Sequence, residues 1–238
     1  SELEDEAFQK CPSQIITKII TSLYKIYSYP DFEDLIPSFL IVLARVAKCD
    51  NFDKQLTALR ILNYYALSQE ESIIGYFDEW KEETDVITTI VQMDLHLEIL
   101  QNSRELIRKV IKEEEIFTFL IKAESSYVTQ RRFAFHLISQ VMSERFDSNA
   151  VIDFISEMNQ NPIELEFLCT LMIHLFSSQK EEFNDTCSEI VDCIFSIGEE
   201  YPNDLTPCMA LFFKELNSID TSKNNPSITK WRINVLGK

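Results

Sequence analysis

Glycine is scarce in this sequence of 238 residues, which contains only Gly75, Gly198 and Gly237. Sheets and α/β folds need glycine in tight turns and at positions of positive φ. Its scarcity therefore favours helices joined by short polar turns. The sequence has no P-loop and no GxGxxG motif, and neither HExxH nor GxSxG occurs. We therefore expect a protein that is not an enzyme, although a surface pair of carboxylates placed as acid and base stays open.

Long apolar runs are missing as well. No stretch reaches the roughly 18 residues that a membrane-spanning helix requires. The first residues, SELEDEAFQK, are acidic, whereas a signal peptide begins with positive charge. The six cysteines include no CxxC pair, and most lie in apolar stretches, where a free thiol packs as a small hydrophobic group. We expect no membrane span, reduced thiols and a cytoplasmic or nuclear protein; the alternative is a disulfide framework.

Positive charge is in short supply, and the formal net charge is −17. Nucleic-acid binding relies on clustered Lys and Arg side chains, so the composition argues against nucleic acid as a partner. An acidic surface attracts a basic partner. The alternative is that the charge only keeps an exposed helical surface soluble.

What the sequence does contain is an internal repeat. Four segments align in one frame: A58-L-R-I-L-N63, H96-L-E-I-L-Q101, A134-F-H-L-I-S139 and M172-I-H-L-F-S177. Their third positions are Arg60, Glu98, His136 and His174, at a constant spacing of 38 residues. The second, fourth and fifth positions are apolar in every copy. A fixed period of this length with helical periodicity predicts an all-α fold, a right-handed α-solenoid of about five helix pairs.

Apolar periodicity places an N-terminal helix near 13–28. The helix pairs follow near 31–48 with 52–68, 70–81 with 84–101, 103–123 with 127–145, 148–158 with 162–178, and 181–200 with 205–217. Pro162 and Pro207 each fit a first helical turn, after Asn161 and Thr206 as N-caps. We expect an acidic N-terminus with a capping helix over 1–30, a helical-repeat domain over 31–217 and a basic tail over 218–238.

The second helices of these pairs, such as QLTALRILNYYAL and QRRFAFHLISQVM, resemble the inner helices of HEAT and armadillo repeats. The likeness covers roughly residues 31–217, and the repeat length is nearer to HEAT. Armadillo nuclear-import adaptors carry a ladder of Trp and Asn on these helices. Trp80 and Trp231 both lie outside that frame, so binding of nuclear-localisation signals is not carried over. The resemblance implies a curved α-solenoid that binds proteins.

A polar stripe follows from the repeat. The sixth position of the four aligned segments is polar in every copy and lies three residues after the third position, that of Arg60. Positions i and i+3 share a helix face. The predicted partner-binding residues of this stripe, on the concave side, are Arg60, Asn63, Glu98, Gln101, His136, Ser139, His174 and Ser177. The alternative for His136, which stands in apolar company, is a position packed beneath neighbouring helices.

A metal site is the other interpretation of the histidines. Helices pack about 8–10 Å apart, so His136 and His174 could reach one ion. No third or fourth ligand lies at an equivalent position of the repeat, and His96 lies at the first position of its segment, two residues before the position of His136 and His174. We therefore expect no metal and no other cofactor.

The segment 69–85 holds seven acidic residues against one lysine, with Ile73, Ile74, Phe77 and Trp80 at helical spacing. One interpretation is an amphipathic helix with a solvated acidic face. The other is an acidic rim with aromatic anchors for a basic, partly apolar peptide. The second interpretation adds Asp78, Glu79, Trp80, Glu82 and Glu83 to the predicted partner-binding residues.

These patterns predict a non-enzymatic scaffold or adaptor whose concave groove holds a basic or amphipathic peptide or helix of a partner protein. One alternative is a structural subdomain of a larger HEAT or armadillo protein that contacts its own chain. A second alternative is a helical-bundle enzyme or cofactor protein. The tail has four basic residues and no acid after Asp220, which indicates a linker or a docking segment.

Overall fold

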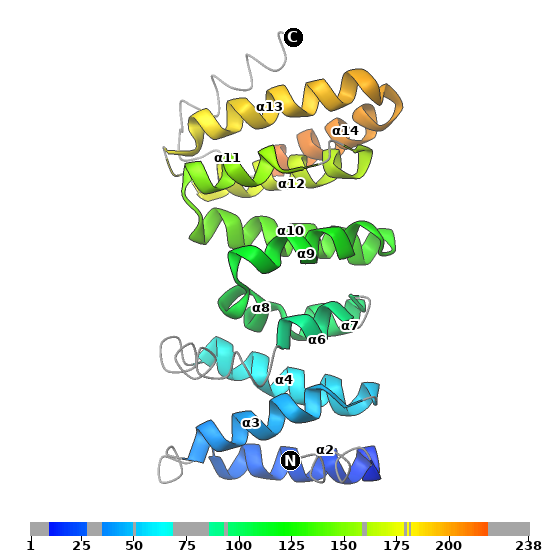
Figure 1. Cartoon of the computed structure of the whole chain (residues 1–238), viewed down its shortest axis with the longest axis vertical. Helices are drawn as coiled ribbons and strands as arrows, with labels where there is room; N and C mark the ends of the chain where they lie inside the picture. The colour runs from blue at the N-terminus through cyan, green and yellow to red at the C-terminus, as the bar shows by residue number, and fades with distance from the viewer. Residues whose placement is uncertain are drawn as a thin grey trace. The chain divides into compact units, whose positions relative to one another are not determined.

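Helices are the only regular elements in the part of the chain that the computed structural model describes, which is residues 10–27, 35–49, 51–68, 86–92, 95–158, 161–178, 180 and 182–218. This confirms the predicted all-α class (Figure 1). The chain divides into two compact units, Ser1–Ala134 and Phe135–Lys238. The division falls within the predicted repeat domain 31–217, whose continuity stays a prediction.

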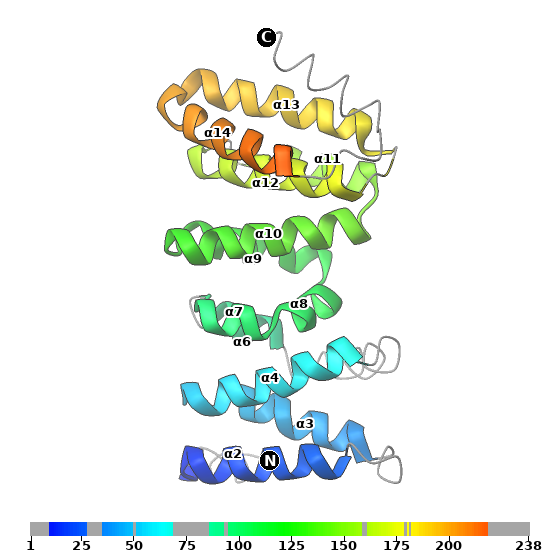
Figure 2. The same ribbon diagram turned by 180° about the vertical axis from the view of Figure 1, so that it is seen from behind.

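The first unit is built around α4. Its helices are α2 (Ser13–Tyr27), α3 (Ile36–Ala47), α4 (Phe52–Ser68), α6 (Val86–Gln92), α7 (Leu97–Asn102), α8 (Arg104–Val110), α9 (Glu113–Glu124) and the first turns of α10 (Val128–Arg145). α4 packs against α2, α3, α7 and α8 (Figure 2). Leu59 and Leu62 of α4 are completely buried, as is Leu43 of α3. Apolar residues three and four positions apart give each of these helices one buried face.

Two helices that we predicted as continuous are interrupted. The predicted helix 84–101 comprises α6 and α7, and between them Leu95 has a φ of 49°. The left-handed conformation costs an L-residue roughly 1–2 kcal/mol, and complete burial of the Leu95 side chain offsets that cost. The predicted helix 103–123 comprises α8 and α9, because Ile111 has extended backbone with ψ 133°. Neither break contains glycine or proline, so the local sequence carries no signal for it.

The second unit is centred on α12. Its helices are the rest of α10, α11 (Ser148–Ser156), α12 (Pro162–Ser178), α13 (Phe183–Glu200) and α14 (Pro202–Ser218). α12 contacts α13 and α14 and is buried along most of its length, as expected for a helix that is apolar all round (Figure 2). Phe167 of α12 is completely buried, with its ring centroid 5.4 Å from that of Phe135 and 6.1 Å from that of Phe154.

The two predicted proline starts have different outcomes. Asn161 Oδ1 accepts hydrogen bonds from the backbone N–H groups of Ile163 and Glu164, at 2.9 and 3.1 Å. Glu164 Oε2 accepts from the Asn161 N–H at 2.8 Å, which completes a capping box. The predicted start of α12 at Pro162 is thus confirmed. The predicted start at Pro207 is wrong, because α14 begins at Pro202 and Pro207 lies inside it.

The six cysteines are all free thiols. Burial raises the pKa of Cys187 to about 12, and burial is also the main reason that the pKa of Cys169 lies well above its ordinary value. A thiol that stays protonated is a poor nucleophile, so these two side chains act as packing groups. Within the described residues, no helix has the length and apolar character needed to cross a membrane.

Candidate protein-binding surfaces

A polar cluster on the surface of the first unit joins α4 to α7. Arg60 Nη2 donates to Glu98 Oε1 at 2.9 Å, and Arg60 Nε donates to Asn102 Oδ1 at 3.0 Å. Asn102 Nδ2 in turn donates to the backbone carbonyl of Glu98 at 2.7 Å. We call Arg60, Glu98 and Asn102 the first polar cluster. The repeat predicted that Arg60 and Glu98 are equivalent, whereas Asn102 was missed, although it lies four residues after Glu98 on the same helix face.

The first polar cluster is exposed and contributes little to stability. The Arg60 and Glu98 side chains are 51% and 45% exposed. An ion pair in this setting stabilises a protein by about 0–1 kcal/mol, because water screens it. What the hydrogen bonds do achieve is orientation: they hold the guanidinium group in one place, with further N–H donors available to a ligand.

Asn63, on the same helix as Arg60, has a structural partner. Its Oδ1 accepts hydrogen bonds from the backbone N–H groups of Glu105 and Leu106, at 2.8 and 3.0 Å. These N–H groups belong to the first turn of α8, where no carbonyl within the helix can accept them. Asn63 therefore caps α8 from another helix, and its side-chain oxygen is already occupied.

A second polar cluster lies in the second unit and consists of His136 of α10, His174 of α12 and Glu215 of α14. His136 Nδ1 is 3.2 Å from His174 Nε2, and the two rings meet edge to face at 70°. Glu215 Oε2 is 3.9 Å from the other nitrogen of His136, Nε2. The His136 side chain is 43% exposed. It therefore reaches the surface, and the alternative of a histidine packed beneath neighbouring helices does not hold.

The histidine pair needs a defined protonation pattern. A hydrogen bond between two imidazole nitrogens requires one ring to donate and the other to accept, so at least one of these nitrogens carries no proton. His174 and Glu215 contact opposite nitrogens of His136, so the three groups do not converge on one point. Among the described residues, no group of three or more His, Cys, Asp or Glu side chains is placed to hold a metal ion.

The remaining residues of the predicted stripe divide between surface and core. Gln101 and Ser177 are exposed, and the Ser177 hydroxyl donates to the backbone carbonyl of Ile173 at 2.7 Å. Ser139, by contrast, is 0% exposed, and among the described residues its hydroxyl has no hydrogen-bond partner. Its predicted place on an exposed stripe is wrong. The neighbouring positions Leu137 and Ile138 are buried as well, so this turn of α10 is covered on more than one side.

Replacing Ser139 by alanine is expected to stabilise the protein by roughly 1 kcal/mol, because a buried hydroxyl without a partner costs about 1–3 kcal/mol and alanine is the better helix former. Urea unfolding followed by circular dichroism measures the change. Ser177→Ala is the matched control on an exposed hydroxyl and should change stability by less than about 0.5 kcal/mol. A destabilised Ser139→Ala variant would show that the hydroxyl has a partner after all.

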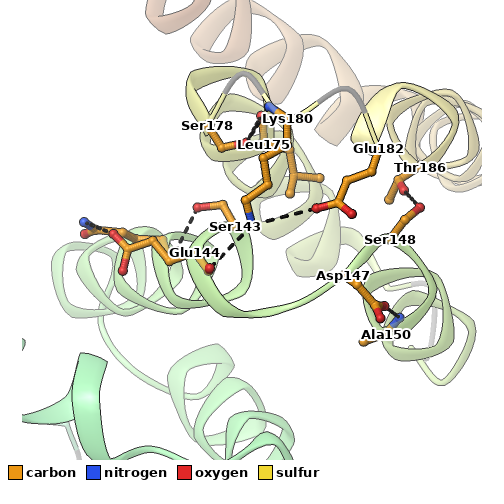
Figure 3. Close-up of polar contacts among 11 residues, drawn as sticks. Ser143, Glu144, Asp147, Ser148, Ala150, Leu175, Ser178, Lys180, Glu182 and Thr186 are labelled. Carbon is orange, nitrogen blue, oxygen red and sulfur yellow. Dashed lines mark hydrogen bonds and ion pairs between the residues drawn. The ribbon is translucent and has the colours of Figure 1, made fainter. Parts of the chain in front are cut away.

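A third group of contacts, which sequence reasoning missed, surrounds Lys180 after α12 (Figure 3). Lys180 Nζ donates to the backbone carbonyl of Glu144 at 3.4 Å and lies 3.9 Å from Glu182 Oε1. Close by, the hydroxyl groups of Ser148 and Thr186 hydrogen-bond to each other and join α11 to α13. Ser148 and Thr186 are 38 residues apart, so the repeat period was the signal that could have found them.

Other predicted partner-binding residues, Asp78, Glu79, Trp80, Glu82 and Glu83, lie outside the described residues. The same holds for residues 1–9 and for most of the basic tail, 219–238. No protein-family model, curated protein or solved structure matches this chain. The assignment of function therefore rests on the surfaces described above.

Proposed function

We propose that this protein is a non-enzymatic scaffold or adaptor that binds a segment of a partner protein along exposed polar faces of its helices. Within each unit, the helices would pack as stacked pairs of the HEAT and armadillo kind, with a period of 38 residues. Three hydrogen-bonded side-chain pairs support this period, because each joins residues 38 positions apart: Arg60–Glu98, His136–His174 and Ser148–Thr186. Arg60–Glu98 and His136–His174 join the second helices of successive helix pairs, and Ser148–Thr186 joins the first helices. The same spacing of 38 residues therefore relates both helices of one helix pair to those of the next.

The observation that carries the function is the pair of polar clusters assembled at the surface. Each cluster joins consecutive second helices through partly exposed side chains: Arg60 and Glu98 are 51% and 45% exposed, and His136 is 43% exposed. Surface hydrogen bonds of this kind add little to stability. They do hold donors and acceptors in fixed positions, which lowers the entropy lost when a partner segment binds.

The charge of the chain supports a basic or amphipathic partner. A net charge of −17 favours encounter with a positively charged segment and raises its association rate at low ionic strength. In this proposal the acidic segment 69–85 supplies steering, and the polar clusters supply the specific hydrogen bonds.

Affinity capture from a cell lysate, quantified by mass spectrometry, tests the proposal with three variants of the full chain. Arg60→Ser with Glu98→Ser removes the first polar cluster without changing the net charge. His136→Ser with His174→Ser removes the second. Lys112→Ser with Glu114→Ser is the matched control, since it removes a partly exposed ion pair of 3.9 Å at the start of α9.

We expect at least one cluster variant to lose partners that the unmodified chain and the control retain, by about tenfold or more. Circular dichroism melts should show that all variants are folded, because the altered side chains lie at the surface. If both folded cluster variants capture the same proteins in the same amounts as the control, these clusters do not bind partners.

A further inference from the structure

One side of α2 carries a row of isoleucines that the described part of the first unit leaves exposed. Ile15, Ile19 and Ile26 are 48%, 47% and 43% exposed. On the adjacent side of the helix Ile16 and Ile20 are 3% and 1% exposed, and α2 contacts α3 and α4. The apolar side of α2 is thus broader than the part of it that is buried.

The exposed row has the spacing of a coiled-coil contact. Ile15, Ile19, Ser22 and Ile26 follow one another at intervals of four, three and four residues, which is the alternation of d and a positions in heptads. We call these four residues the α2 seam. Side chains at this spacing form one straight line along a helix and insert between side chains of a second helix.

Positive charge flanks the α2 seam. Lys18 and Lys25 are exposed and stand one residue before Ile19 and Ile26, at the g positions of the heptad. The helix contains no Asp or Glu, although the chain as a whole has a net charge of −17. Residues at g positions form ion pairs across a coiled-coil interface and select the partner by its charge.

We propose that the α2 seam binds an amphipathic helix of a separate partner protein, whose apolar seam is flanked by Glu or Asp. The isoleucines supply the apolar contact, and the two lysines pair with the acidic flank. An antiparallel contact between the α2 helices of two copies is disfavoured, because their lysines would face each other. The α2 seam shares no residue with the two polar clusters, so the test of this proposal is independent of the function proposed above.

Two synthetic peptides of about three heptads test the charge selection. Both carry Leu and Ile along the seam; one has Glu and the other has Lys at the e and g positions. Fluorescence anisotropy measures binding of each labelled peptide to the full chain of 238 residues. We expect the Glu-flanked peptide to bind and the Lys-flanked peptide to bind roughly tenfold more weakly or not at all, with a difference that shrinks at high salt. Equal binding of the two peptides would overturn the proposal.

Substitutions in the protein separate the seam from its flank. Ile19→Ser with Ile26→Ser should abolish binding of the Glu-flanked peptide. Lys18→Glu with Lys25→Glu should reverse the preference, so that the Lys-flanked peptide becomes the better ligand. A reversed preference is a gain of binding, which misfolding cannot imitate. Ile121→Ser is the matched control, since Ile121 of α9 is 53% exposed and lies outside α2; it should bind as the unmodified chain does.

Two rival occupants of the α2 seam give different results. If a second copy covers it, for example through its acidic segment 69–85, sedimentation velocity will show a dimer that Ile19→Ser with Ile26→Ser dissociates. If a membrane surface covers it, vesicles with phosphatidylserine will bind the protein, and the Glu-flanked peptide will not. Either result would replace the proposed partner helix.

Discussion

Replacing Phe167 by alanine is expected to lower the free energy of unfolding of the second unit by about 3–5 kcal/mol. Phe167 is completely buried, and its ring contacts those of Phe135 and Phe154. The cost exceeds the loss of apolar burial alone, because α12 is covered along most of its length and its neighbours can fill the cavity only in part.

Urea unfolding followed by circular dichroism measures this effect. If the two units unfold in separate steps, only the transition of the second unit should move to lower urea concentration. Tyr127→Ala is the control, because that aromatic side chain is 83% exposed and its loss should change stability by less than about 0.5 kcal/mol. A loss below about 1 kcal/mol for Phe167→Ala would mean that α12 is not the centre of a packed core.

Replacing Asn63 by alanine is expected to cost roughly 2–3 kcal/mol, the second largest effect that we predict. The substitution leaves the N–H groups of Glu105 and Leu106 without their acceptor, and each unpaired buried donor costs about 1–3 kcal/mol. Asn63→Asp retains an oxygen at the same position and places a negative charge at the start of α8, where the helix dipole favours it. It should therefore keep most of the stability.

Hydrogen exchange distinguishes this mechanism from a general loss of packing. In Asn63→Ala the amides of Glu105 and Leu106 should exchange faster than those of the buried α3–α4 contact, and in Asn63→Asp they should stay protected. Gln101→Ala is the control, since Gln101 is an exposed polar residue of α7. Unchanged exchange at the two amides in Asn63→Ala would refute the capping role.

The sequence was most informative where the cause of a structure is local or periodic. Pro162 and Asn161 identify the start of α12, because a proline in the first turn and an N-cap side chain act over a few residues. The spacing of 38 residues predicted that Arg60 is equivalent to Glu98 and His136 to His174, and both pairs are in contact. Equivalent positions of successive helices face each other when the same helix packing recurs.

Other features depend on which helices come together. The turn at Leu95 has no glycine or proline, so its left-handed backbone follows from the burial of its side chain. Ser139 has the polarity of a surface residue but is buried. Glu215 approaches His136 from a helix far along the chain, and Asn63 caps a helix to which it does not belong.

By itself, the sequence determined the all-α class and most helix positions. Both follow from local conformational preference and from the period of the apolar pattern. Only the tertiary structure decided which polar side chains lie at the surface and which cap a helix. It also decided that part of the apolar side of α2 stays exposed among the described residues. The apolar pattern of a helix is fixed by its sequence. The solvent-accessible surface that each side chain buries depends on the helices packed against it.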